Sequence, residues 1–203
     1  MHTPMARCAF SYDIGWGRDR RACLRCALLL HRIHPAMPSN PLRRYLHGDD
    51  ACWAIVTGAT NGMGEEFAHQ LAGLGFHIVL HGRSPGKLQA VAHAIEAKHK
   101  GIHVKTVAID GAAHPPDVSR VTRALEGEGG KTSRVTVLVN NLGVVSQGYP
   151  LLEEETPDEL AAQISTNTVF PTVLASTMLP HLKQNAPSLM INMASLGAWA
   201  PTP

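Results

Sequence analysis

The stretch Thr57-Gly58-Ala59-Thr60-Asn61-Gly62-Met63-Gly64 decides the fold of this 203-residue chain. It follows a short apolar run, 51–57, that predicts a buried strand, and it precedes 65–74, where apolar residues recur at helical spacing up to Gly75. The glycines permit a tight turn and a close approach of the backbone to a pyrophosphate, which the start of a helix attracts. In this context the turn predicts a dinucleotide-binding unit rather than a merely tight connection.

The chain beyond this unit continues to alternate between apolar strands and amphipathic helices. We expect strands at 77–80, 104–109, 135–139 and 189–193, and helices that open at Ser84-Pro85, at 118–125 and over 157–182. The last helix should break or shift its register near Pro171. Strands that are apolar on both faces, with helices between them, predict an α/β fold with a doubly wound parallel sheet.

The first 47 residues have a different charge from the rest. They hold eight Arg but only Asp13 and Asp19 as acids, whereas 48–203 is mildly acidic. We predict an Arg-rich, disordered extension at 1–47 and a nucleotide-binding domain at 48–203; a presequence-like basic helix at 18–33 is the alternative. No apolar run approaches the roughly 20 residues that span a bilayer. A nucleic-acid partner is not expected, because interleaved aromatic residues are lacking.

The four cysteines form no regular disulfide framework. Three of them, Cys8, Cys23 and Cys26, lie in the extension, and Cys52 begins the first strand. We interpret them as reduced thiols of an intracellular protein. Cys23 and Cys26 form a C-x-x-C pair, but a structural zinc site needs four ligands, and we predict no metal site.

The G-x-x-x-G-x-G spacing and four further motifs, in order over about 50–200, resemble the short-chain dehydrogenase/reductase family. Those motifs are Asp110, the turn 140–143 (Asn-Asn-Leu-Gly), Asn167 and the segment 191–195 that ends in Ser195. The resemblance implies a Rossmann-like sheet in the order 3-2-1-4-5, here incomplete at about five strands, with an irregular N-terminal extension. It also implies two catalytic residues, Ser195 to hydrogen-bond the substrate oxygen and Asn167 to hold a proton-relay water. The residues expected to bind the cofactor are Gly58, Thr60, Asn61, Gly62, Met63, Gly64, Arg83, Asp110, Asn140, Asn141 and Gly143.

The end of the second strand indicates which dinucleotide is bound. An acid at this place binds the ribose hydroxyl of NAD, whereas an Arg accommodates the 2′-phosphate of NADP. The sequence here is Leu80-His81-Gly82-Arg83-Ser84, without a carboxylate. The planar fork of Arg83 can pair with a phosphate, and we predict NADP(H) as the cofactor; a solvated loop cation is the alternative.

The resemblance implies two further catalytic residues that the chain does not contain. A Tyr that donates a proton, followed four positions later by a Lys that lowers its pKa, should lie about a dozen residues beyond Ser195. The chain ends at Pro203, and none of Tyr12, Tyr45 and Tyr149 has a Lys four residues on. We therefore expect the chain to be truncated before the Tyr-x-x-x-Lys segment, to be close to inactive, and to leave its fifth strand as an unprotected edge.

The segments 45–50 and 79–83 and the Asn-Asn-Leu-Gly turn narrow the resemblance to very-long-chain 3-oxoacyl-CoA reductases and related 17β-hydroxysteroid dehydrogenases. This branch implies an NADPH-dependent carbonyl oxidoreductase whose substrate is a 3-oxoacyl-CoA or ketosteroid-like carbonyl or alcohol. Its members are anchored in the endoplasmic reticulum, but the chain has no apolar segment for this, so membrane association is in doubt and a cytoplasmic location stays open. The alternative is a non-catalytic nucleotide-binding or dimerising module, with a homodimer formed through the long helix 157–182.

Overall fold

The computed structural model describes residues 40–48, 51–127, 132–146, 148 and 150–195. The C-x-x-C pair and the basic helix expected at 18–33 lie outside the described residues. No helix within these ranges is both long and apolar enough to cross a bilayer.

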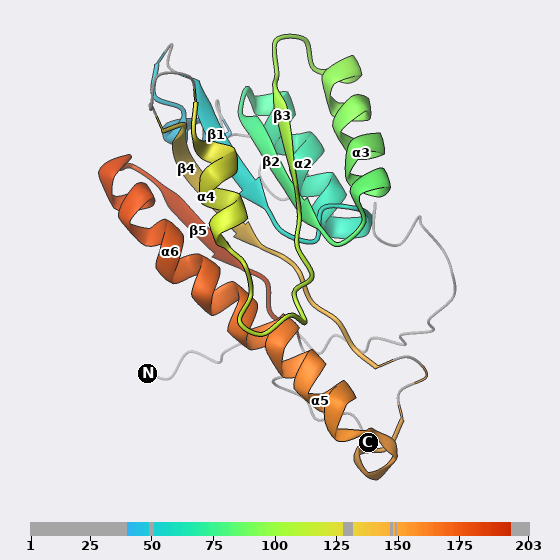
Figure 1. The fold of residues 1–203 in the computed structure, drawn as a ribbon. Helices are drawn as coiled ribbons and strands as arrows, with labels where there is room; N and C mark the ends of the chain where they lie inside the picture. Colours follow the sequence, from blue (N-terminus) through green and yellow to red (C-terminus); the bar gives the residue numbers. More distant parts are fainter. Residues whose placement is uncertain (1–39, 49–50, 128–131, 147, 149, 196–203) are drawn as a thin grey trace, which may run out of the picture. The chain divides into compact units, whose positions relative to one another are not determined.

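Five parallel strands form one sheet in the order β3-β2-β1-β4-β5 (Figure 1). Their bounds are β1 (Cys52–Val56), β2 (His77–Gly82), β3 (Val104–Ala108), β4 (Arg134–Asn140) and β5 (Leu189–Asn192). The predicted α/β class and strand order are confirmed. Among the described strands β5 pairs with β4 alone, so it forms the edge that the order 3-2-1-4-5 requires.

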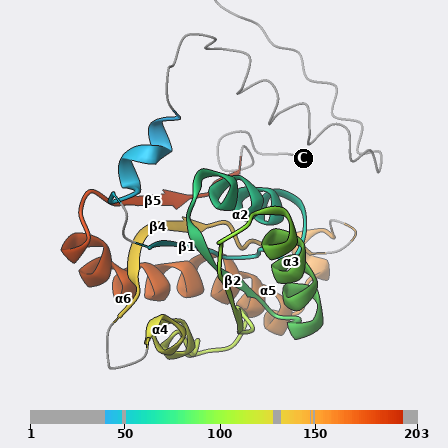
Figure 2. The same cartoon turned by 90° about the horizontal axis from the view of Figure 1, so that it is seen from above.

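Helices cover both faces of the sheet, as Figure 2 shows from above. On one face lie α2 (Gly62–Leu74) and α3 (Pro85–Lys98); on the other lie α4 (Ser119–Leu125) and α6 (Phe170–Gln184). Successive side chains of a strand point to opposite faces, so β1 supplies Ala54 and Val56 to the first core and Trp53 and Ile55 to the second. This explains why all five residues of β1 are apolar and buried.

The helix boundaries follow local backbone chemistry. Helix α2 begins at Gly62, three residues before the expected start, because Asn61 adopts the extended conformation of an N-cap. It ends at Gly75, which takes the left-handed conformation with φ = 109°. Ser84 occupies the N-cap of α3 as predicted, but its side chain makes no capping hydrogen bond.

The long C-terminal helix changes register where the sequence predicts it. Helix α5 (Pro157–Ile164) leads into a π-helical turn, Ser165–Val169, and then into α6. The N–H of Phe170 donates to the carbonyl of Ser165, five residues back. Pro171 has no N–H to donate within the helix, and this accounts for the altered hydrogen-bond ladder next to it.

Residues 40–47 fall in the segment expected to be an extension, but the structure places them against the domain. A short 3-10 helix, η1 (Pro41–Tyr45), precedes Leu46, which packs on the first core. His47 follows, with its Nε2 atom 3.1 Å from the carbonyl oxygen of Pro187 and its Nδ1 atom 3.0 Å from the guanidinium of Arg134. The domain that the structure describes thus begins before residue 48.

One ionisable side chain, that of His81, is fully buried in β2 (0% exposed). Its Nε2 atom lies 3.2 Å from the carbonyl oxygen of Ile109, and its ring stacks on Phe170 at a centroid distance of 4.6 Å. Burial lowers the pKa of His81 from 6.5 to about 4, and the hydrogen bond to Ile109 opposes this shift only in part. The ring is therefore neutral in the folded protein at neutral pH.

This burial predicts a pH-dependent stability. Because unfolded His81 binds a proton at higher pH than folded His81, its contribution is complete above pH 6.5 and is lost as the pH falls to about 4. The loss amounts to roughly 3 kcal/mol in the free energy of unfolding. Urea unfolding of His81→Leu between pH 4.5 and 7.5 should show a shallower dependence than the wild type.

The matched control is His93→Leu, which removes an exposed histidine of α3. This variant retains His81 and should keep the wild-type dependence on pH. Equal slopes for wild type and His81→Leu would contradict the assignment of the acid sensitivity to His81.

Candidate cofactor and active site

The carboxyl ends of the five strands meet at one edge of the sheet, where the predicted site residues gather. The turn after β1 lies between those that follow β2 and β4, because β1 is the strand between these two. The direction in which successive strands are added to the sheet reverses between β1 and β4. In open α/β sheets this switch point is where ligands bind. The predicted site residues at this edge are Gly58, Thr60, Asn61, Gly62, Met63, Gly64, Arg83, Asp110, Asn141, Gly143 and Ser195, which follow strands, and Asn140, which ends β4.

The glycine-rich turn has the geometry that the sequence predicts for an anion site. Gly58 and Gly62 adopt positive φ angles of 64° and 57°, which side chains other than glycine rarely tolerate. A Cβ atom on Gly64 would overlap the carbonyl oxygen of Gly58. Asn61 caps α2 with its backbone alone, and Met63 projects an exposed side chain from the first helical turn. The first N–H groups of α2 lack partners within the helix and can receive a phosphate.

The turn is joined to the loop after β4 by Thr57 and Asn141. The hydroxyl oxygen of Thr57 accepts hydrogen bonds from the N–H groups of Asn141 (2.9 Å) and Leu142 (3.0 Å). The same hydroxyl donates to the carbonyl of Val139 at 3.3 Å. The side-chain amide of Asn141 donates in return to the carbonyls of Thr57 (3.0 Å) and Gly58 (3.3 Å). Asn141 therefore holds the glycine-rich turn in place through two of its carbonyl groups.

The end of β2 contacts the same turn. The N–H of Ala59 donates to the carbonyl of His81 at 2.9 Å, and a Cβ atom on Gly82 would lie 2.7 Å from the methyl carbon of Thr60. Gly82 is thus required for Thr60 to pack here. Arg83 follows immediately and is exposed, and the stretch 80–84 holds no carboxylate.

Asp110 lies just beyond β3 and is exposed. Its carboxylate accepts a hydrogen bond from the N–H of Ala112 at 3.0 Å, and its carbonyl accepts one from Ala113 at 3.2 Å. These bonds fold the chain into a turn next to Gly111, where a Cβ atom would lie 2.7 Å from Leu142. The loop after β3 therefore lies close to the loop after β4.

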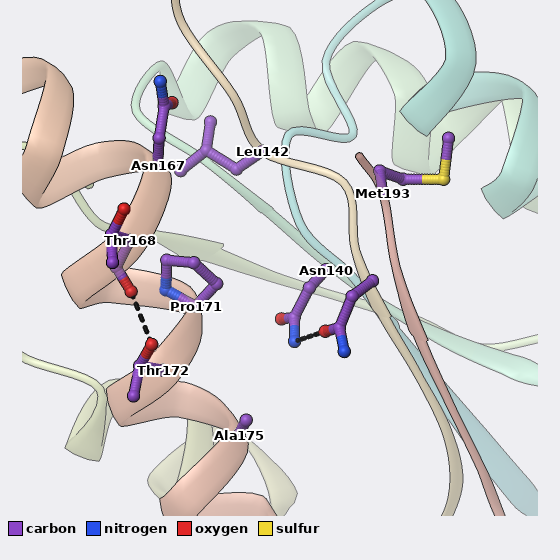
Figure 3. Close-up of a pocket in the computed structure, with 9 residues that line it drawn as sticks. Asn140, Leu142, Asn167, Thr168, Pro171, Thr172, Ala175 and Met193 are labelled. Carbon is purple, nitrogen blue, oxygen red and sulfur yellow. Dashed lines mark hydrogen bonds between the residues drawn. The ribbon is translucent and has the colours of Figure 1, made fainter. Parts of the chain in front are cut away.

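A hollow of about 350 Å³ opens between the ends of β4 and β5 on one side and the π-helical turn with α6 on the other (Figure 3). On the strand side Asn140 donates its amide hydrogen to the side-chain oxygen of Asn192 at 2.9 Å. The other amide atom of Asn140, its Oδ1, is buried and has no hydrogen-bond partner among the described residues. The lining consists of Asn140, Leu142, Asn167, Thr168, Pro171, Thr172, Ala175, Asn192 and Met193.

The two predicted catalytic residues flank this region. Asn167 lies in the π-helical turn, and its side chain accepts from the N–H of Val144 and donates to the carbonyl of the same residue, both at 2.8 Å. The side chain thereby holds the loop that starts at Gly143. Ser195 is exposed and follows β5 by three residues. Its expected role in catalysis and that of Asn167 stay predictions.

Two residues of the site act through contacts that the sequence did not predict. Thr57 belongs to the glycine-rich motif, but its role as a junction between two loops becomes visible only when β1 and β4 are neighbours. His81 stands before Arg83 in an apolar strand, and only its burial distinguishes it from the surface histidines. A polar residue inside an otherwise apolar strand is the signal that could have identified it.

No cluster of three or more His, Cys, Asp or Glu side chains suited to a metal ion occurs within the described part of the chain. The residues at the sheet edge instead suit a dinucleotide. They offer glycine backbone and a helix start for the diphosphate, and a cation for an additional phosphate.

Comparison with known proteins agrees with this geometry. Residues 52–203 match the family described as short chain dehydrogenase. A very-long-chain 3-oxoacyl-CoA reductase of Aspergillus clavatus is 36% identical over 169 residues, which are 82% of this chain and 46% of the relative. The chain thus spans about half the length of this curated relative.

Two solved structures resemble the domain. The L-sorbose reductase of Gluconobacter frateurii, complexed with NADPH and L-sorbose, has a TM-score of 0.66 at 26% identity, over 75% of this chain and 56% of that one. A metagenomic short-chain oxidoreductase in complex with NADP has a TM-score of 0.64 at 31% identity, over 75% of this chain and 66% of that one. With the family match over 52–203, the strand order and the glycine-rich turn, the chain belongs to the short-chain dehydrogenase/reductase family.

Proposed function

We propose that this chain forms the NADP(H)-binding part of a carbonyl reductase. The observation that carries the proposal is the junction of the glycine-rich turn with the end of β2, where Thr60 packs on Gly82 and Arg83 follows. A diphosphate at the start of α2 would place the adenosine ribose toward this strand end. Arg83 is then the nearest cation in sequence for a 2′-phosphate, and no acid competes for the ribose hydroxyl.

The relatives support this choice of cofactor. The two structures described above were solved with NADPH and with NADP. Asp110, at the end of β3, is suited to contact the adenine, and Asn140, Asn141 and Gly143 lie at the end of β4 on the nicotinamide side. These roles complete the set of cofactor contacts that the family resemblance implies.

The substrate we propose is a 3-oxoacyl-CoA or a ketosteroid-like carbonyl compound, by analogy with the reductase of Aspergillus clavatus. NADPH supplies a hydride to such a carbonyl when it is bound. The hydroxyl of Ser195 would donate a hydrogen bond to the carbonyl oxygen, where negative charge develops. Asn167 would keep the loop at Val144 in place and hold a water on the proton path.

A non-catalytic nucleotide-binding module is the second candidate. One observation favours it: the proposed cofactor contacts all lie between Gly58 and Gly143, at the ends of β1 to β4 and on the turns that follow them. A homodimer through the long helix would fit either function, and Leu179 on α6 is exposed (42%).

The chain is expected to prefer NADPH over NADH. The purified chain should bind NADPH at least tenfold more tightly than NADH, because a charge-assisted pair with the 2′-phosphate is worth about 1.5–3 kcal/mol. Arg83→Gln should lose about tenfold in NADPH affinity and less than twofold in NADH affinity. Isothermal titration calorimetry measures both constants, and Arg120→Gln, at an exposed position of α4, is the control. Equal affinities for the two dinucleotides in the wild type would contradict the assignment.

The glycine-rich turn is expected to tolerate no side chain at position 64. Gly64→Ala should abolish binding of both dinucleotides, since a Cβ atom there displaces the carbonyl of Gly58 and the amide of Asn141. Gly86→Ala is the matched control, because it adds the same methyl group to α3 with no atom within 4 Å. Tryptophan-to-NADPH energy transfer can follow binding, and circular dichroism checks folding. Wild-type affinity in Gly64→Ala would show that the diphosphate binds elsewhere.

Turnover by this chain is expected to be slow. Mixed with NADPH and a 3-oxoacyl-CoA, this chain should oxidise NADPH at least 100-fold more slowly than a typical reductase, because general acid catalysis contributes about 10²–10⁴-fold. Absorbance at 340 nm measures the rate, and a full-length relative serves as the positive control. A rate of the order of 10 s⁻¹ would contradict both the module and the assumed need for the Tyr-Lys pair.

A further inference from the structure

We infer that His81 is a positioning residue that sets the geometry of the 2′-phosphate site and so contributes to the choice between NADPH and NADH. The inference rests on the proposed NADP(H) function. His81 would contact neither the dinucleotide nor the substrate. It would act by holding the ends of β2 and β3 in place.

The contacts of His81 join three segments that the proposed site needs. Its carbonyl accepts from the N–H of Ala59 in the glycine-rich turn at 2.9 Å. Its imidazole Nε2 lies 3.2 Å from the carbonyl oxygen of Ile109 at the end of β3. Its ring stacks on Phe170, the first residue of α6, at 4.6 Å and an interplanar angle of 21°. The imidazole therefore connects the ends of β2, β3 and α6, while the main chain of the same residue holds the glycine-rich turn.

The chemistry of these contacts fixes the protonation state of the ring. A carbonyl oxygen can only accept, so Nε2 must carry the hydrogen that it shares with Ile109. The second ring nitrogen, Nδ1, is buried and has no hydrogen-bond partner among the described residues. A proton there would place an unpaired charge in the core, and burial accordingly lowers the pKa of His81 to about 4. His81 is therefore a neutral ring of one tautomer.

This hydrogen bond matters for the site because of what adjoins it. The N–H of Ile109 donates to the carbonyl of Gly82 at 3.1 Å, so a backbone bond and the imidazole bond together clamp the ends of β2 and β3. Arg83 and Asp110 each follow directly after a clamped residue. An apolar residue at 81 could fill the space, but it would leave the Ile109 carbonyl without its donor and free the two strand ends to separate.

The test compares an apolar variant with one that keeps a donor. His81→Leu should weaken NADPH binding at least fivefold while NADH binding changes less than twofold, which lowers the selectivity ratio. His81→Gln retains an N–H donor of similar reach and should restore the ratio to within twofold of the wild type. His93→Leu, the same substitution at an exposed position of α3, should leave both affinities unchanged.

The outcomes separate this inference from the proposed function. Failure of the wild type to bind NADPH overturns the proposed function and the inference together. Wild-type binding with an unchanged ratio in folded His81→Leu, or an equal loss of both dinucleotides, overturns the inference alone, since general destabilisation would lower both affinities alike.

A second measurement needs no variant to fold. In wild-type protein labelled with ¹⁵N-histidine, the His81 ring should give the signals of a neutral Nε2–H tautomer from pH 5.5 to 8, with and without NADPH. An Nδ1–H tautomer would overturn the inference, because a ring in that state has no hydrogen on Nε2 to donate to Ile109.

Discussion

The hydroxyl of Thr57 fixes the distance between the first and fourth strands at the edge where the site lies. It accepts hydrogen bonds from two backbone N–H groups of the loop after β4 and donates one to the carbonyl of Val139 near the end of that strand. With the amide of Asn141 it holds the glycine-rich turn so close that Gly64 has no room for a side chain. The shape of the anion site therefore depends on a contact between segments more than 80 residues apart in sequence.

The second core extends this arrangement to the adenosine side. Apolar residues of β2, β3, α4 and α6 form this core, and the buried ring of His81 stacks on one of them, Phe170. Its neutral ring replaces an apolar side chain without leaving the donor unpaired, so packing and hydrogen bonding impose the same geometry on the loop that bears Arg83. The burial of His81 thus underlies both the predicted loss of stability in acid and the proposed geometry of the loop that bears Arg83.

Much of this arrangement could be predicted from the sequence, because strand and helix periodicity, Gly75 and Pro171 act locally. The position of the helical break is confirmed, and so is the strand order, which only the family resemblance implied. What escaped prediction depends mostly on neighbours distant in the chain: the packing of 40–47 on the core and the roles of Thr57 and His81. Asn167 illustrates the same limit, since only the folded loop reveals that its amide binds the backbone of Val144.

The separation of binding from chemistry in this fold follows from where the side chains reside. All proposed dinucleotide contacts lie between residues 58 and 143, at the ends of β1 to β4 and on the turns that follow them. The proposed catalytic side chains, Asn167 and Ser195, belong to the π-helical turn, which lines the hollow, and to the segment after β5, which pairs with β4 at Asn140. The two sets nevertheless meet at the hollow, where Asn140 donates to Asn192 and Asn167 holds Val144, the residue after Gly143. Affinity is then the property that reports directly on the geometry described for β1 to β4.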